Sequence, residues 1–163
     1  MPLFYLDTSA LVKRYRSEPG TEVVEQLLKN PRSEDRFFLS FLWILELTSG
    51  ILRLAKAGQL RDATATQILA QFRSDVRELY KVWPLSEEVA VSAVAVVEQH
   101  KLRSADALHL AAAQTIAGLA PGVLTVMVTS DRELLTAAEA VRLGVLDPQA
   151  SGAAEKVREL RRR

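Results

Sequence analysis

Two aspartates in this sequence stand where an apolar run gives way to hydroxyl residues. Asp7 follows the run Leu3–Leu6, and Asp131 ends the segment "VLTVMVTSD". Short apolar runs of this kind are typical of buried strands, and open α/β sheets bind their ligands beyond the carboxyl ends of the strands. We therefore expect both carboxylates to lie in one crevice. The alternative for each is an ordinary helix N-cap, a position that Asp favours.

Two further acids interrupt segments that are otherwise apolar. Glu46 lies in "FLWILELTSGIL", and Asp106 lies in "LRSADALHLAAA". Acidic side chains are rarely buried without a partner, so each of these two needs a cation, a hydrogen-bond donor or solvent. Glu46 shares a helical stripe with Ser49 and Arg53, and a salt bridge there is the alternative to a functional role. Asp106 falls in the first turn of a predicted helix, where the alternative is that it complements the helix dipole.

Four carboxylates at one edge of a sheet repel one another, and a protein keeps such a cluster chiefly when cations neutralise it. The sequence contains no cysteine, so the available ligands are hard oxygen atoms. Oxygen ligands favour Mg²⁺ or Mn²⁺ over zinc or copper. A divalent ion held in this way acidifies a water molecule and stabilises charge on a phosphoryl group. The expected chemistry is metal-dependent hydrolysis of phosphodiester bonds.

The elements that must position these acids alternate between strand and helix. Strand-like runs occur at Leu3–Leu6, "RFFLS", "VLTVMVTSD" and "VLDP", and "YKVWPL" is a doubtful strand that Pro84 confines to an edge. Helical segments with an apolar face separate these runs. The alternation predicts an α/β fold with a short, mainly parallel central sheet flanked by helices.

Composition narrows the class of protein. The 163 residues suit one domain, and 21 Lys plus Arg against 20 Asp plus Glu give a net charge of +1, so a nucleic-acid site must be a local patch. The absence of cysteine excludes disulfides, zinc–thiolate sites and thiol nucleophiles. The first residues lack the pattern of a signal peptide, and no apolar run reaches the roughly 18–20 residues of a membrane span. We therefore expect a cytoplasmic protein.

The acids and their neighbours carry a family resemblance. The segments "YLDTSALVKRY", "SFLWILELTSGILRL", "LRSADALHLAAA" and "VTSDRELLTAAEAVRLGVLDP" resemble, in this order, the four acidic motifs of PIN-domain ribonucleases. "LDTSALVK" and "DALHLAAA" resemble in particular the VapC toxins of toxin–antitoxin pairs. The resemblance implies a PIN-like α/β/α sandwich for residues 1–148. A basic C-terminal tail, residues 149–163, matches no motif, and we expect it to be solvated.

The resemblance also implies site residues and partners. The acids that would hold Mg²⁺ or Mn²⁺ and act in catalysis are Asp7, Glu46, Asp106 and Asp131. Thr8, Ser9 and Thr129 match hydroxyl positions that orient waters or the acids themselves. Family members cleave RNA, usually dimerise and are silenced by a cognate antitoxin. The implied protein is an endoribonuclease that forms a homodimer, with RNA as substrate and a VapB-type antitoxin as partner.

Basic residues and one histidine lie beside the acidic motifs. The candidates for contact with RNA phosphates, with an ordinary solvated surface as the alternative, are Lys13, Arg14, Arg16, Lys101 and Arg103. His109 comes three residues after Asp106 in an Ala- and Leu-rich segment. We expect His109 to be a packed, hydrogen-bonded histidine, and a metal ligand is the alternative.

Two other classes of protein stay open. Response-regulator receivers and haloacid-dehalogenase phosphatases also place an Asp after the first strand, but the phosphatases have a second Asp where this sequence has Ser9. Receivers have an acidic pair before that strand, and "MPLFY" contains no acid. The second alternative is a PIN-like module that binds RNA or protein without cleavage. The set of four acids argues against it, because a pure binder gains nothing from their repulsion.

Overall fold

Residues 2–29, 31 and 35–162 are described by a computed structural model of the chain. Five parallel strands form one sheet in the order β3-β2-β1-β4-β5. Their bounds are Leu3–Leu6 (β1), Arg36–Ser40 (β2), Tyr80–Trp83 (β3), Thr125–Val128 (β4) and Gly144–Leu146 (β5). The predicted α/β class with a short parallel sheet is confirmed. The doubtful strand is real and forms one edge, where Pro84 follows it without breaking a ladder.

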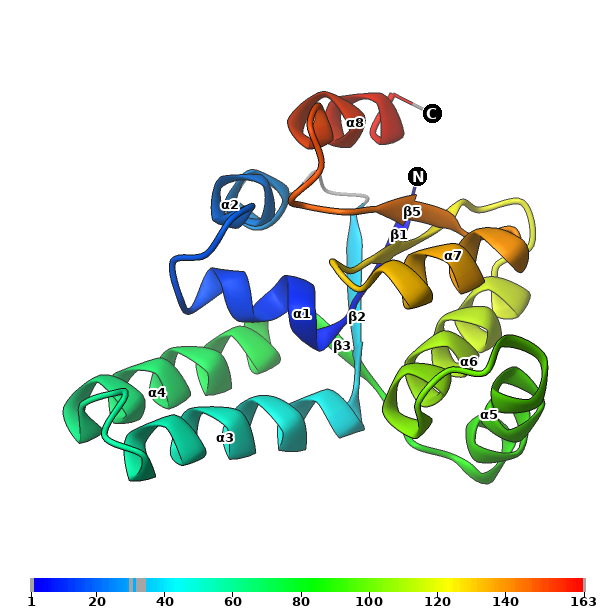
Figure 1. Ribbon diagram of the computed structural model, residues 1–163. Helices are drawn as coiled ribbons and strands as arrows, with labels where there is room; N and C mark the ends of the chain where they lie inside the picture. Colours follow the sequence, from blue (N-terminus) through cyan, green and yellow to red (C-terminus); the bar gives the residue numbers. More distant parts are fainter. Residues whose placement is uncertain (1, 30, 32–34, 163) are drawn as a thin grey trace.

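Helices connect the strands and cover both faces of the sheet (Figure 1). Their bounds are Thr8–Leu11 (α1) with the 3-10 turn Val12–Arg14 (η1), Thr21–Lys29 (α2), Phe41–Lys56 (α3), Asp62–Glu78 (α4), Glu87–His100 (α5), Ser104–Leu119 (α6), Arg132–Ala140 (α7) and Ala153–Leu160 (α8). One face packs against α1 to α4 and α8, and the other packs against α5, α6 and α7. Figure 1 shows these two groups on opposite sides of the sheet, so the chain is a three-layer α/β/α sandwich.

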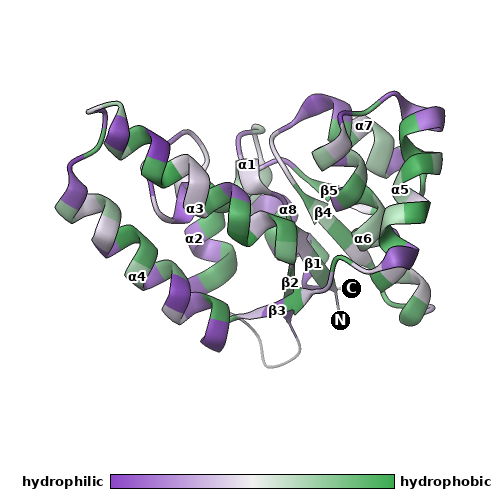
Figure 2. Cartoon of the chain, turned by 90° about the horizontal axis from the view of Figure 1, so that it is seen from below, coloured by the Kyte–Doolittle hydropathy of each residue, from purple (hydrophilic) through white to green (hydrophobic). Residues whose placement is uncertain are grey.

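The strands supply both cores by alternation, because successive strand residues point to opposite faces. Phe4 and Leu6 join the core under α1 to α4 and α8, whereas Tyr5 joins the core under α5 to α7. Met127 of β4 lies beside Tyr5 in the register and shares its core. All four side chains are fully buried. In Figure 2 the central strands are largely green, and α4 carries purple segments between green ones as an amphipathic surface helix should.

The order of the strands creates a crevice at their carboxyl ends. The chain runs from β1 outward to β2 and β3, and it then crosses back to place β4 on the other side of β1. Ligand sites of open α/β sheets lie where the direction of winding reverses in this way. Leu6 pairs with Val128, and the backbone N–H of Asp7 donates to the Val128 carbonyl at 3.0 Å. The residues that follow β1 and β4 therefore leave the sheet side by side.

The C-terminal tail differs from its prediction. The division of the chain after Pro148 stays a prediction, but the expectation of a solvated tail is wrong for residues 153–160, which form α8 and pack against α2 and β5. Val157 is fully buried, and the Arg161 guanidinium lies 2.6 Å from the buried carboxylate of Asp35. Arg163 lies outside the described residues. In the part of the chain that the structure describes, no helix is both long and apolar enough to cross a membrane.

Candidate active site

Asp7 follows β1 and caps the helix α1, which is one of the two roles predicted for it. The cap bond is only part of its surroundings, because Oδ2 accepts from the backbone N–H of Ser9 at 3.2 Å, from the Ser9 hydroxyl at 2.7 Å and from the Thr129 hydroxyl at 2.9 Å. The residue is 4% exposed. Three donors fix the orientation of this carboxylate, and its Oδ1 faces Nε2 of His109 at 3.7 Å.

Thr129 connects Asp7 to the second strand-end acid. Its Oγ1 donates to Asp7 and accepts the backbone N–H of Asp131 at 3.0 Å. Asp131 in turn caps α7, since its Oδ1 accepts the backbone N–H of Leu134 at 3.0 Å. The cap engages one carboxylate oxygen and leaves the other for a ligand. The capping role and the proposed site role of Asp131 are therefore compatible.

Glu46 reaches the same edge from the second turn of α3. Its Oε2 accepts the Thr8 hydroxyl at 2.6 Å and lies 3.0 Å from Nε2 of His109. Burial favours the neutral acid, but the hydrogen bonds from His109 and Thr8 outweigh it and hold the pKa of Glu46 below its usual value. Glu46 is thus ionised at neutral pH. Its partners are a hydroxyl and an imidazole, where a salt bridge to Arg53 was the alternative.

His109 lies on α6 between two of the acids and is 1% exposed. Its Nδ1 is 2.9 Å from the hydroxyl of Tyr5, whose pKa burial raises far above its usual value, so the hydroxyl stays protonated. Burial opposes the charged imidazolium, but the hydrogen bond to Glu46 and the charges of Asp7 and Glu46 outweigh it and raise the pKa of His109. The prediction of a packed, hydrogen-bonded histidine is confirmed.

The position of His109 between Glu46 and Asp7 was not foreseen from the sequence. The available signal was its spacing from Asp106, because side chains three residues apart share one face of a helix. Tyr5 was missed for a similar reason. It reads as one more apolar strand residue, although a buried tyrosine hydroxyl normally requires a hydrogen-bond partner.

Asp106 occupies the first turn of α6, as predicted. Burial raises its pKa, and the negative charges of Asp7 and Asp131 raise it further. Like charges act in this way only when they lie close together. Asp7 and Asp131 follow neighbouring strands, and Glu46 is joined to Asp7 through His109, so the effect of their charges on Asp106 supports its placement near the same edge of the sheet.

The donor chemistry of this edge fits a divalent cation. Carboxylate oxygens are the ligands that Mg²⁺ and Mn²⁺ prefer, and a cation would offset the negative charges of Asp7 and Asp131 that raise the pKa of Asp106. Among the described residues, no three acidic or imidazole side chains are already arranged as a ligand set. The assignment of Asp7, Asp106, Asp131 and Glu46 as metal ligands therefore stays a prediction.

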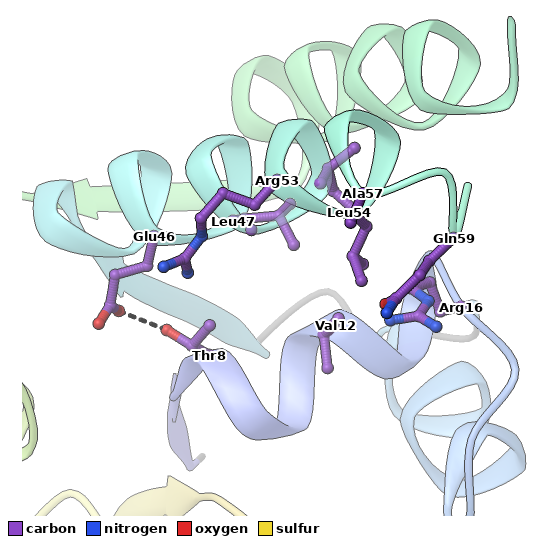
Figure 3. Close-up of a pocket in the computed structure, with 11 residues that line it drawn as sticks. Thr8, Val12, Arg16, Glu46, Leu47, Arg53, Leu54, Ala57 and Gln59 are labelled. Carbon is purple, nitrogen blue, oxygen red and sulfur yellow. Dashed lines mark hydrogen bonds between the residues drawn. The ribbon is translucent and has the colours of Figure 1, made fainter. Parts of the chain in front are cut away.

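An apolar groove begins at Glu46 and Thr8 and runs between α3 and the α1–η1 segment (Figure 3). Its volume is about 470 Å³, and its floor includes Leu47 and Val12. Figure 3 shows the Glu46–Thr8 hydrogen bond at one end of the groove, with Arg53 extending toward Glu46. The groove thus opens directly beside the acidic edge.

The basic candidates fall into two groups. Lys13 is 2% exposed with its ammonium 3.6 Å from Glu18, and Arg14 is bonded to Asp75 at 2.6 Å. Because their charges are used inside the protein, we withdraw both from the predicted RNA contacts. Arg16, Lys101 and Arg103 are exposed, so their role in RNA binding stays a prediction.

A comparison with protein families decides which family this fold represents. Residues 4–142 match the family model described as the PIN domain. The chain belongs to the PIN-domain family. This PIN-domain chain is 36% identical over 146 residues to Ribonuclease VapC35 of Mycobacterium tuberculosis (strain ATCC 25618 / H37Rv), an alignment that covers 90% of this chain and 97% of the relative. The resemblance found in the sequence is confirmed.

Solved structures show the same PIN-domain fold. FitAcB from Neisseria gonorrhoeae superimposes with a TM-score of 0.68 at 21% identity, covering 91% of this chain and 99% of that one. VapBC-1 from nontypeable Haemophilus influenzae gives a TM-score of 0.63 at 13% identity, with 91% and 99% coverage. At these identities the likeness is one of fold.

Proposed function

We propose that this PIN-domain protein is a Mg²⁺- or Mn²⁺-dependent endoribonuclease, and that it is the toxin of a VapBC-type toxin–antitoxin pair. The observation that carries the proposal is that Asp7 and Asp131 follow the neighbouring strands β1 and β4 and are joined through Thr129, with Asp106 in the first turn of α6, where burial and their charges raise its pKa. A binding surface without chemistry has no use for this repulsion. The relation to Ribonuclease VapC35 supports RNA as the substrate class.

The proposed metal ligands are Asp7, Asp106 and Asp131, with Glu46 beside them. A bound divalent cation would supply Lewis acidity, acidifying a water and offsetting charge on the scissile phosphate. The chain itself supplies orientation. Ser9 and Thr129 hold Oδ2 of Asp7 and leave Oδ1 toward the crevice, and the α7 cap holds one oxygen of Asp131.

Glu46 contributes a fixed negative charge at the mouth of the crevice. Thr8 and His109 hold its Oε2, and the lowered pKa keeps it ionised. Tyr5 orients the imidazole from behind, at 2.9 Å from Nδ1. When Tyr5 donates to Nδ1, the proton of the neutral ring is on Nε2, which then donates to Glu46.

Cleavage of RNA with and without metal tests the proposal. Purified protein should cut a structured RNA internally in the presence of Mg²⁺ or Mn²⁺, should stop in EDTA, and should recover when metal is restored. Sequencing of new 5′ ends identifies the cut sites. Full activity in EDTA would overturn the metal mechanism. Binding of RNA without cleavage under every metal condition would favour the binding module, and a stable aspartyl-phosphate after incubation with acetyl phosphate would favour the phosphoryl-transfer class.

The proposed partner is a VapB-type antitoxin that covers the acidic edge. The structural neighbours described as VapBC-1 and as a toxin–antitoxin complex from Klebsiella pneumoniae support this class of partner. The apolar groove that starts at Glu46 would receive an apolar segment, and the acidic edge would attract arginine. Co-expression with the product of the neighbouring reading frame should yield a stable complex without nuclease activity. A failure of every neighbouring product to bind would remove the protein from this class of pair.

We also propose that the protein forms a homodimer and acts in the cytoplasm, where its RNA would be. Exposed apolar side chains on α3 and α5 support an interface between copies, among them Phe41, Leu45, Val91 and Val94. Light scattering after gel filtration should give twice the monomer mass of 18.0 kDa. Leu45→Asp should shift the protein toward the monomer, and a monomeric parent at micromolar concentration would reject the dimer.

A further inference from the structure

A cavity outside the acidic crevice lies between the C-terminal end of α5 and one face of α7. Its volume is about 390 Å³, and its polar lining consists of His100, Lys101, Arg132, Glu133 and Thr136. Lys101 and Arg132 outnumber Glu133, so the lining has a net positive charge even with a neutral histidine. We propose that this cavity binds a phosphate group of the RNA backbone next to the scissile bond, an inference that rests on the nuclease function proposed above.

The position of the cavity places it beside the chemistry. Arg132 follows Asp131 directly and opens α7, so a group bound to Arg132 lies at the same edge of the sheet as the acids. Lys101 belongs to the short connection that leads into α6, whose first turn carries Asp106. An RNA strand held with one phosphate among the acids would pass this cavity with a neighbouring phosphate.

The imidazole of His100 forms part of the cavity wall. Its Nε2 is buried and, among the described residues, has no hydrogen-bond partner. A buried ring nitrogen without a partner costs free energy, and His100 lines the cavity. Because Nε2 is covered, a rotation of the imidazole would be needed to turn it, in protonated form, toward a phosphate oxygen in the cavity, and the hydrogen bond would then remove the cost.

Lys101 has an unusual backbone for its residue type. Its φ is 59°, in the left-handed region that favours glycine and asparagine. Its ammonium donates to the Glu98 carbonyl at 2.6 Å, which leaves two of its three N–H groups for a ligand. This conformation ends α5 and places Lys101 at the start of the connection to α6.

The test measures RNA binding separately from cleavage. Asp7→Asn protein in EDTA serves as the background, and a fluorescein-labelled single-stranded oligoribonucleotide is the probe. Lys101→Asn with Arg132→Gln should raise the Kd about tenfold and lower the slope of log K against log salt by about 0.7, as expected for one lost phosphate contact on a single strand. The matched control is Arg73→Gln with Arg77→Gln, which removes two exposed charges from α4. Its Kd should stay within about twofold of the background, because neither arginine lines the cavity and only the general attraction of RNA phosphates is weakened.

Three further measurements separate contact from misfolding. His100→Leu should raise the Kd about threefold, whereas His100→Gln, which keeps a donor, should retain most of the affinity. Titration with inorganic phosphate should shift the NMR signals of Lys101 and Arg132 and leave those of Arg73 and Arg77 in place. In an otherwise unchanged, active protein, Lys101→Asn with Arg132→Gln should raise KM and keep kcat within about twofold, since only uniform binding is lost.

The outcomes distinguish this inference from the proposed function. Suppose that the parent is active, and that the Lys101/Arg132 double variant and the Arg73/Arg77 control change the Kd and the salt slope equally. This result would overturn the phosphate site and leave the nuclease intact. An inactive parent that still binds RNA through Lys101 and Arg132 would overturn the nuclease and keep the phosphate site. RNA that fails to bind at low salt would overturn the site.

Discussion

Among the regions in which this molecule buries carboxylates, two treat them in opposite ways. Asp75 on α4 is 4% exposed and accepts hydrogen bonds from Arg14 at 2.6 Å, Tyr15 at 2.9 Å and Gln71 at 2.9 Å. Burial alone would raise the pKa of Asp75, but these donors outweigh it and lower the pKa. The protein itself neutralises this charge, and the result is a link between η1 and α4.

The acidic edge lacks this internal balance. Burial and the charges of Asp7 and Asp131 raise the pKa of Asp106, and the opposing effects of His109 and Arg103 are smaller. The hydroxyls of Ser9 and Thr129 orient Asp7 without supplying a charge. The comparison teaches that burial of an acid does not by itself indicate function. What separates the two regions is whether the protein provides the countercharge or leaves it to a ligand.

The largest expected effect comes from making the same change in both regions. Asp7→Asn should lower RNA cleavage by at least about 100-fold, because a misplaced ligand misplaces the reacting groups, and should leave the melting temperature nearly unchanged. Asp75→Asn should do the reverse, with near-normal activity per folded molecule and a lower melting temperature. Cleavage rates and thermal unfolding of both variants check this. Equal activity losses in the two variants would abolish the distinction between the regions.

The second effect is the loss of the internal countercharge. Arg14→Met keeps much of the buried stem but leaves Asp75 without its cation, and it should lower the free energy of unfolding by about 2 kcal/mol. Urea denaturation measures this value. Adding Asp75→Asn to Arg14→Met should restore part of the loss, because the buried group is then neutral. A double variant as unstable as the sum of both single variants would show that the pair does not interact.

The two carboxylate regions also differ in how far the sequence predicts them. The strand-end positions of Asp7 and Asp131 were predictable, because apolar runs mark the strands and parallel strands end at one edge. The pairing of Arg14 with Asp75 was not, since the two are 61 residues apart and no local pattern joins them. Lys13 and Arg14 were therefore taken for surface cations.

The C-terminal helix α8 has an apolar spacing in the sequence that predicts a packed helix, although we expected a solvated tail. Ala153, Val157 and Leu160 recur at intervals of four and three residues, which is one face of a helix. The basic cluster that follows it is typical of a solvated tail instead. The convergence of Asp106 with the strand-end acids was implied by the family resemblance, but the link from Glu46 to His109 depends on one side-chain hydrogen bond between α3 and α6, which no local pattern predicts.

The third prediction tests whether the acidic edge of the sheet binds a divalent cation. Millimolar Mg²⁺ or Mn²⁺ should raise the melting temperature of the parent by a few degrees, because an ion bound only by the folded state stabilises it. Metal-free Asp131→Asn should melt at or above the metal-free parent, since asparagine still caps α7 and the repulsion at Asp106 falls. The variant should respond less to metal.

Thermal unfolding of parent and Asp131→Asn, each with EDTA and with metal, gives four midpoints. Asp75→Asn is the matched control, and its response to metal should equal that of the parent. Equal responses of the parent and Asp131→Asn would remove Asp131 from the site. A flat response in all three proteins would remove the metal site itself.

The smallest effect is a pH dependence that belongs to Asp75 alone. Because its pKa is lower in the folded protein than the value of about 3.9 typical of an unfolded chain, the charged form contributes stability above about pH 5. This contribution is lost as the pH falls through the unfolded value toward the lowered folded one. The difference in free energy of unfolding between parent and Asp75→Asn should therefore shrink between about pH 5 and pH 3, by less than about 1.4 kcal/mol per pH unit.

Urea denaturation in EDTA at several pH values measures this difference without any contribution from bound metal. The double variant Arg14→Met with Asp75→Asn lacks the titrating group, so its difference from Asp75→Asn should stay constant over the same range. A parent-to-Asp75→Asn difference that grows on acidification would mean that Asp75 is protonated more easily in the folded protein, and the contrast between the two carboxylate regions would then fail.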